Sequence, residues 1–279
     1  MRNFLKRTAQ GALLVLSLNG CANSRALVTN TTLEQRCDNK SFVDYIEDTN
    51  HICSLRTNES LLGREELFHR YLAWLCEISQ TNFDPDDFSI IPDNEFFGFF
   101  YSGIPGIFTP TGMYWFGTIY VRTEGSTFPS IAHEFGHATD NQLGYLDYAF
   151  SSRSRVRAEA VAEAFELYTN IRLIQEGAKA LENQFELVKP AIAAGRTLDD
   201  HLEHESRYIS GRTLVYVLMS TLTNSHDVWH YLANTPEDEV YQRVNDIIIE
   251  KKGLAESVQS GYDRYTHERE NAKDESINQ

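Results

Sequence analysis

The sequence has little positive charge. Its 25 lysines and arginines are outnumbered by 40 aspartates and glutamates, which leaves a formal net charge of −15. This imbalance argues against nucleic acid as a partner and against electrostatic docking on anionic lipid. The chain is nevertheless 279 residues long and 42% hydrophobic, so it can bury a substantial core.

Cysteine is also scarce, with four in the whole chain. If the protein is exported to an oxidising compartment, one pair is expected to form a disulfide. Cys37 and Cys53 lie in polar, loop-like sequence and are the predicted pair, while a bond between Cys53 and Cys76 stays open. Cys76 falls in line with nearby apolar residues at helical spacing, which favours a buried thiol.

The first 20 residues lack an apolar run long enough to span a bilayer. Arg2, Lys6 and Arg7 precede a short apolar run, 11–18, which is typical of a secretory signal peptide. The sequence Leu-Asn-Gly-Cys that ends at Cys21 resembles the lipobox of bacterial lipoproteins. This resemblance implies cleavage before Cys21, fatty acylation such as palmitate on it, and anchoring to a membrane of the bacterial cell envelope.

The alternative for this segment is ordinary cleavage close to the small residue Ala22, which would release a secreted, soluble protein. In either case residues 1–20 are excluded from the folded domain. We expect 21–36 to be a polar tether, 37–264 to be one folded domain, and 265–279 to be a charged, disordered tail.

The folded part changes character along its length. Apolar residues recur at helical spacing over 60–79, whereas aromatic, β-branched, Pro and Gly residues dominate 83–128. Helical patterns return after that, at 157–175, 198–222 and 236–252, and Ser151–Arg155 is expected to be a polar loop. The pattern predicts an α+β fold in which a small sheet precedes a mostly helical carboxyl-terminal part. The aromatic residues of 83–128 favour core packing over a substrate-binding wall.

The pattern His-Glu-x-x-His occurs once, at His133, Glu134 and His137. We expect a helix that begins near Thr127 and ends near Gly144. On such a helix the two histidines stand one turn apart on one face and can bind a single Zn²⁺, while Glu134 can take a proton from water. The alternative is a surface helix with two solvated histidines.

A catalytic zinc site needs a third protein ligand. Glu159 and Glu163 are four residues apart on a strongly helical segment, so they share one face. We assign Glu159 to the metal and Glu163 to a supporting role, in which it orients a ligating histidine. The reverse assignment and two solvent-exposed carboxylates are the alternatives.

Together, His-Glu-Phe-Gly-His at 133–137 and Ala-Glu-Ala-Val-Ala-Glu-Ala-Phe at 158–165 resemble the catalytic core of the anthrax lethal factor family, which the Pro-Pro endopeptidases share. The resemblance covers about 117–168. It implies a zincin-like fold of the gluzincin type, one zinc ion held by His133, His137 and Glu159, Glu134 as the general base, and Glu163 as a supporting carboxylate.

One position departs from this family. A tyrosine stands seven residues before the ligand glutamate in the family and hydrogen-bonds the oxyanion, but this chain has Ser152 there. An oxyanion donor contributes about two orders of magnitude in rate. The candidate replacements in this sequence are Tyr145, Tyr148 and Tyr208, with His201 and His204 as further possibilities.

The leading hypothesis is therefore an exported, membrane-anchored zinc endopeptidase. Its substrate, a peptide or protein, is expected to add as an extra strand along 117–122. The rival is an envelope lipoprotein that binds zinc without turnover and acts as a binding or assembly factor, and a third hypothesis is a peptidase with one dedicated substrate.

Overall fold

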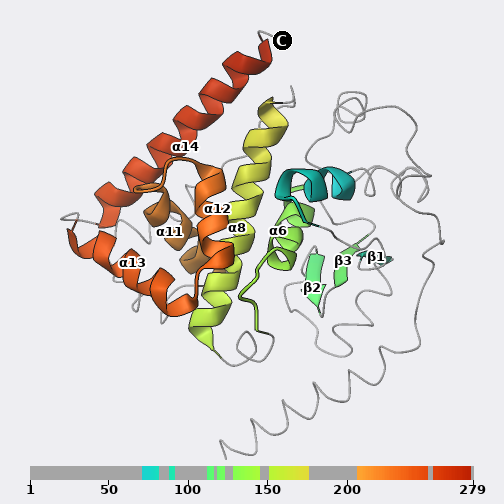
Figure 1. Ribbon diagram of the computed structural model, residues 1–279, viewed down its shortest axis with the longest axis horizontal. Helices are drawn as coiled ribbons and strands as arrows, with labels where there is room; N and C mark the ends of the chain where they lie inside the picture. The colour runs from blue at the N-terminus through green and yellow to red at the C-terminus, as the bar shows by residue number, and fades with distance from the viewer. Residues whose placement is uncertain are drawn as a thin grey trace, which may run out of the picture. The chain divides into compact units, whose positions relative to one another are not determined.

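The computed structural model describes residues 71–81, 88–91, 112–115, 118–122, 128–144, 151–175, 206–250 and 254–277. These residues form a helix over 71–79, within the predicted helix at 60–79, then a small sheet and a mostly helical part, so the α+β class predicted from the sequence is confirmed at this level (Figure 1). None of the described helices is both long enough and apolar enough to cross a lipid bilayer.

The sheet consists of β1 (Phe88–Ile91), β2 (Gly112–Trp115) and β3 (Thr118–Arg122). β3 lies in the middle, parallel to β1 and antiparallel to β2. Both edges of β3 are thus already paired, and a substrate strand cannot add along 117–122. That prediction was wrong because β1, although distant in sequence, occupies the edge that the sequence left open.

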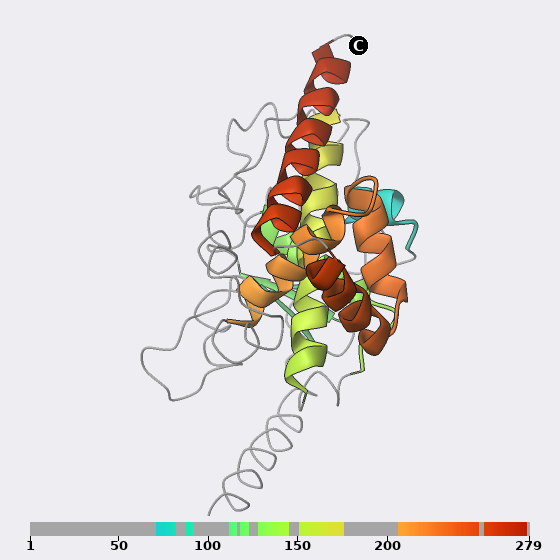
Figure 2. The same ribbon diagram turned by 90° about the vertical axis from the view of Figure 1, so that its left-hand side faces the viewer.

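Helix α8 (Ser152–Gln175) is the centre of the helical part. It packs against α6 (Phe128–Ala138) on one side and against the later helices on the other (Figures 1 and 2). Its middle turns are rich in alanine and are buried around most of the helix, including Ala160, Val161 and Phe165. A helix that is apolar on most sides is expected to lie inside a domain.

Glycine allows the closest approach between α6 and α8. A Cβ atom added at Gly136 would lie 2.6 Å from Cα of Ala162 and 3.1 Å from Cβ of Phe165. The preceding residue of α6, Phe135, stacks its ring on that of Phe165, with centroids 5.4 Å apart. The two helices that carry the predicted site are therefore held together by backbone contact beside aromatic packing.

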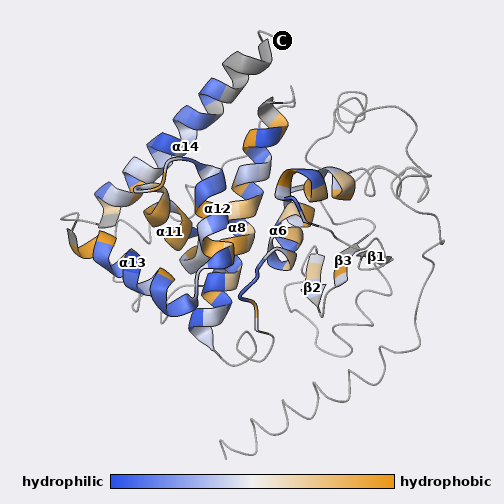
Figure 3. Cartoon of the chain, viewed as in Figure 1, coloured by the Kyte–Doolittle hydropathy of each residue, from blue (hydrophilic) through white to orange (hydrophobic). Residues whose placement is uncertain are grey.

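Four further helices follow α8 in the described residues: α11 (Arg207–Met219), α12 (Ser225–Asn234), α13 (Glu237–Glu250) and α14 (Leu254–Ile277). α11 is predominantly hydrophobic, whereas hydrophilic residues dominate much of α14 (Figure 3). α11 lies against both α8 and α14. The helical part thus surrounds α8 and α11, which contribute much of the core.

A buried ion pair joins α6 to α8 and α12. Arg157 donates to both carboxylate oxygens of Asp140, at 2.9 and 2.8 Å, and also to the carbonyl oxygens of Leu232 and Thr235. Arg157 and Asp140 are only 3% and 8% exposed. Because every partner is a backbone or carboxylate oxygen, the guanidinium group fixes the end of α6 against the end of α12.

Several boundaries differ from the sequence predictions. The motif helix ends at Ala138, not near Gly144, and the predicted Arg-rich loop at 151–155 is already helical from Ser152. The predicted helix at 198–222 is described over Arg207–Met219, and α12 was not predicted. In contrast, the three strands fall within the predicted segment 83–128, and α13 lies within the predicted helix at 236–252.

The predicted disordered tail is the largest correction. Helix α14 continues to Ile277, and Tyr265 is fully buried within it. The hydroxyl of Tyr265 accepts a hydrogen bond from the side-chain amide of Asn170 on α8, at 3.1 Å. Charged composition suggested a solvated tail, but a few apolar residues suffice to dock the helix on α8 and α11.

Candidate metal centre

Helices α6 and α8 bring the three predicted ligands together. Nε2 of His133 lies 3.2 Å from Oε2 of Glu159, and Nε2 of His137 lies 3.7 Å from the same oxygen. The two imidazole rings are nearly perpendicular, with centroids 5.1 Å apart. One nitrogen of each histidine and one oxygen of Glu159 therefore face a common point.

This arrangement fits a metal ion. The three candidate ligand atoms lie within 4.8 Å of one another. In a tetrahedral zinc site with bonds of 2.0–2.1 Å, neighbouring ligand atoms are about 3.3 Å apart. Nε2 of His133 and Nε2 of His137 lie 3.2 and 3.7 Å from Oε2 of Glu159, on either side of that value. The group could accept a metal ion after small side-chain adjustments.

The predicted histidines and glutamates are largely buried, which contradicts the alternatives that placed them on a solvated surface. The side chains of His133 and His137 are 13% and 8% exposed, and that of Glu159 is 2% exposed. Ile131 and Phe135 of the same helix are fully buried in the core. The histidines are thus held between helices and do not lie on a solvated surface.

Strand β2 contacts the side chain of Glu134. The backbone N–H of Tyr114 donates to Oε2 of Glu134 at 2.7 Å. A Cβ atom at Gly112 would lie only 2.9 Å from Cγ of Glu134. Glycine at this position therefore lets the strand approach the carboxylate, and a fixed backbone dipole orients the carboxylate.

A second carboxylate, that of Glu166, approaches His133. Oε2 of Glu166 lies 3.5 Å from Nδ1 of His133, the ring nitrogen that does not face Glu159. Glu163 instead pairs with Arg212 of α11, whose Nε is 2.7 Å from Oε1. Glu163 still belongs to the cluster, since one ligand atom from each of His133, Glu163 and Glu166 lies within 4.8 Å of the other two. Glu166 was not predicted, although it follows Glu163 by about one turn and lies on the same face of α8.

The electrostatics of the ligands are set by burial and by one another. Burial opposes the charge of His133, but hydrogen bonds to Glu159 and Glu166 raise its pKa well above 6.5. Burial lowers the pKa of His137 to about 4, so this imidazole stays neutral. Burial opposes the charge of Glu159 as well, but His133, His137 and Arg207 together lower its pKa. His137 and Glu159 are thereby held in the forms that bind metals, a neutral imidazole and an ionised carboxylate.

Two further carboxyl groups titrate near neutrality. Burial raises the pKa of Glu134 to about 7, partly offset by His133 and by the Tyr114 hydrogen bond. Burial and the neighbouring Glu166 raise the pKa of Glu163 to about 7, against the effect of Arg212. A general base is most effective when its pKa is near the working pH. Glu134 has that property in this structure.

Two residues at the start of α11 complete the described part of the centre. Nε of Arg207 lies 3.0 Å from Oε1 of Glu159, and the ring of Tyr208 is 6.3 Å from that of His133. Tyr208 was one of the predicted oxyanion donors, and the structure places it beside the ligands. Arg207 was missed because nothing local in the sequence connects it to Glu159.

Most of the remaining predicted site residues fall outside the part of the chain that the structure describes. Tyr145, Tyr148, Cys21, Cys37 and Cys53 are outside the described residues. Cys76 is described and lies partly buried against the hydrophobic core. Ser152 is exposed at the beginning of α8, where its hydroxyl accepts a hydrogen bond from Arg155 at 3.4 Å. Two helical turns separate it from Glu159, a distance of about 10 Å along the axis.

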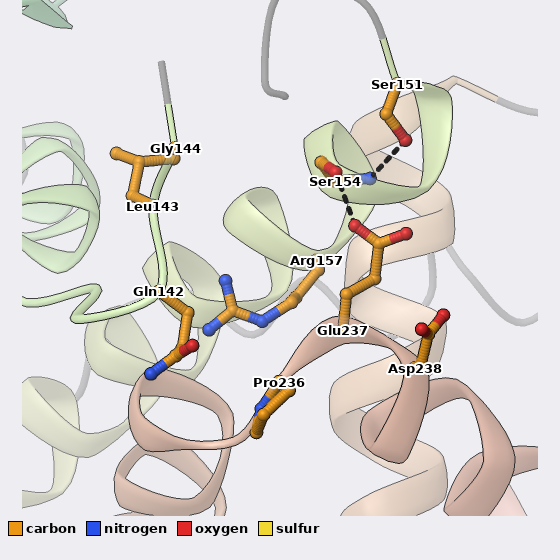
Figure 4. A pocket seen from close by; sticks show the side chains of 9 residues that line it. All are labelled: Gln142, Leu143, Gly144, Ser151, Ser154, Arg157, Pro236, Glu237 and Asp238. Atoms are coloured by element: carbon orange, nitrogen blue, oxygen red, sulfur yellow. Dashed lines mark hydrogen bonds between the residues drawn. The ribbon is translucent and has the colours of Figure 1, made fainter. Parts of the chain in front are cut away.

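A polar pocket of about 410 Å³ lies near the beginnings of α8 and α13, and no candidate ligand lines it (Figure 4). Two of its charged groups, Glu237 and Arg157, are engaged with neighbouring atoms. Ser154 donates a short hydrogen bond to Glu237, and Arg157 is bound to Asp140. Since Arg157 and Glu159 point to different faces of α8, the pocket is separate from the metal centre.

No family model, no curated protein and no solved structure matches this chain. Any inference about function therefore depends on the chemistry of the residues themselves. The observation with the most weight is the convergence of His133, His137 and Glu159, because it joins two motifs that are separated in sequence.

Proposed function

We propose that this chain is a zinc-dependent endopeptidase of the gluzincin type, with a zincin-like arrangement of sheet and motif helix. The observation that carries the proposal is the buried group of His133, His137 and Glu159 next to the carboxylate of Glu134. Two histidines and one glutamate, with one position left for water, form a known ligand set of catalytic zinc. Zinc in such a site lowers the pKa of water and polarises a carbonyl group.

The residues of the centre have separate roles in hydrolysis. His133, His137 and Glu159 hold the ion, and Glu166 and Arg207 orient two of these ligands. Glu134 accepts a proton from the attacking water and delivers it to the leaving amide nitrogen.

The cellular setting is part of the same proposal. The signal-like start and Cys21 support an exported protein that is anchored to a bacterial envelope through lipid. The substrate is a peptide or protein. An extended peptide cannot pair with β3, so within the described sheet only the outer edges of β1 and β2 remain for strand addition.

The test is peptide cleavage by purified protein supplied with zinc. We expect one zinc per chain by elemental analysis, and cleavage of a proteome-derived peptide library by the wild type but not by Glu134→Gln at equal zinc content. The exposed Glu77→Gln is the matched control and should cleave as the wild type does. Undiminished cleavage by Glu134→Gln would reject Glu134 as the base.

The zinc-binding protein without turnover is the second candidate, and the exposed position of Ser152 favours it. This candidate predicts one zinc per chain with no cleavage of any library peptide. It also predicts that Glu134→Gln restores the wild-type phenotype to a deletion strain, because binding would not need the general base. Loss of both cleavage and rescue in Glu134→Gln identifies the peptidase.

A further inference from the structure

The first turn of α11 presents two adjacent side chains to the metal centre. Arg207 contacts the ligand Glu159 through Nε, at 3.0 Å from Oε1. Tyr208 places its ring 6.3 Å from the ring of His133. Because Glu159 turns its other oxygen, Oε2, to the two histidines, Arg207 engages it without occupying the shared face of the ligands.

The two side chains are joined to each other. Nη2 of Arg207 lies 2.9 Å from the hydroxyl oxygen of Tyr208, and its Cζ lies 4.9 Å from the centroid of the same ring. A guanidinium group can only donate, so the tyrosine oxygen is the acceptor in this bond. The hydroxyl proton of Tyr208 is thereby directed to a different acceptor, and the adjacent positive charge strengthens it as a donor.

A cap and a close contact with α8 fix the position of helix α11, which carries both residues. The Ser206 side chain caps α11 by accepting a hydrogen bond from the backbone N–H of Ile209, at 3.3 Å. A Cβ atom added at Gly211 would lie 3.0 Å from Cβ of Glu159, so α11 touches α8 at the ligand itself. Arg207 and Tyr208 are 40% and 37% exposed, which leaves them accessible to a ligand from solvent.

We propose that Arg207 and Tyr208 form the oxyanion-binding wall of this centre, and that they replace a donor at Ser152. The inference rests on the proposed hydrolytic function. As the water oxygen bonds to the scissile carbon, the carbonyl π electrons move to the carbonyl oxygen. Tyr208 donates a hydrogen bond to that oxygen, and Arg207 supplies a fixed positive charge. The electron pair then returns, the C–N bond breaks, and the proton held by Glu134 passes to the nitrogen.

The wall can be tested by anion binding, without turnover. The full chain is loaded with Co²⁺, whose visible spectrum reports its ligands, and is titrated with methylphosphonate, a tetrahedral oxyanion. The wild type should bind it. Tyr208→Phe keeps the ring and loses only the hydroxyl, and we expect its Kd to rise about 10-fold, as for a lost charge-assisted hydrogen bond. The Kd of Arg207→Gln for methylphosphonate should rise by at least as much.

Arg243 and Tyr231 offer matched controls, since Arg243 also lies over a tyrosine ring, at 4.7 Å, but between α13 and α12. Arg243→Gln and Tyr231→Phe should leave the Kd for methylphosphonate unchanged. If Tyr208→Phe takes up one cobalt per chain and binds the anion as tightly as the wild type, the wall is rejected. A wild type that binds cobalt but no methylphosphonate rejects it too.

Failure of the proposed function looks different from failure of the wall. A wild-type chain that takes up no cobalt would reject the metal centre, and with it the inference. Where a library peptide is cleaved, Tyr208→Phe should lower kcat about 100-fold while KM changes little, because the donor acts on charge that develops in the transition state. An equal kcat would overturn the assignment of Tyr208.

Discussion

Oε2 of Glu166 lies 3.5 Å from Nδ1 of His133, while Nε2 of the same ring faces Glu159. The imidazole is therefore bracketed by two carboxylates, one at each nitrogen. A carboxylate at Nδ1 fixes the tautomer in which Nε2 is free to bind a metal, and it makes that nitrogen a better ligand.

Glu166→Gln should therefore weaken zinc binding about 10- to 100-fold, as is usual for loss of a partner of a ligating histidine. Competition with a chromophoric chelator measures the affinity. The exposed Glu77→Gln should not change it. Glu163→Gln should weaken zinc binding less than Glu166→Gln does, because Glu163 pairs with Arg212. The opposite order would return the supporting role to Glu163.

Gly136→Ala should loosen the contact between α6 and α8. The new methyl group would meet Cα of Ala162 at 2.6 Å, and backbone cannot move aside as a side-chain end can. Overpacking of this kind costs about 1–3 kcal/mol. Urea denaturation in EDTA measures the loss. Ser260→Ala, at an exposed position of α14, is the control and should leave stability nearly unchanged. An equally stable Gly136→Ala would show that the helices do not pack this closely.

The buried pair of Asp140 and Arg157 makes a distinct prediction. Asp140→Ala leaves the guanidinium group buried without its carboxylate, which should cost about 3–5 kcal/mol. Replacing both residues, Asp140→Ala with Arg157→Met, removes the unpaired charge and should recover part of that loss. Asp238→Ala, at an exposed position, is the control. If the double variant is no more stable than Asp140→Ala, the unpaired charge is not the cause.

The pKa of Glu134 gives the metal-free protein a pH dependence of known sign. Folding raises this pKa from 4.5 to about 7. Between these values the folded state binds more protons at Glu134 than the unfolded state, so this group makes stability fall as the pH rises. Glu134→Gln removes the effect, and its Tm relative to the wild type should increase from pH 4.5 to pH 7 in EDTA.

The exposed Glu239→Gln serves as the control for that series, and its difference in Tm from the wild type should stay flat over the same range. The comparison between variants matters because His137, with a pKa lowered to about 4, acts in the opposite direction in both proteins. A constant difference between Glu134→Gln and the wild type would show that Glu134 is not buried in the folded state.

The sequence by itself determined the motif residues and the local elements that carry them. His133 and His137 share a helix face because of their spacing, and the same holds for Glu159 and Glu163, so these pairs follow from helical geometry. The strands were predicted from the aromatic and β-branched residues of 83–128, and helix α13 from its periodic apolar residues, because both signals are local. The charged α14 was missed because its burial depends on contacts with distant helices.

Only the tertiary structure decided which groups surround the predicted ligands. Arg207 reaches Glu159, Tyr208 approaches His133, and Tyr114 donates its backbone N–H to Glu134. None of these contacts follows from local spacing, because each joins different elements of the fold. The order of the strands, with β3 in the middle, was decided in the same way. Local periodicity fixes which face a side chain occupies, but packing between elements fixes what that face meets.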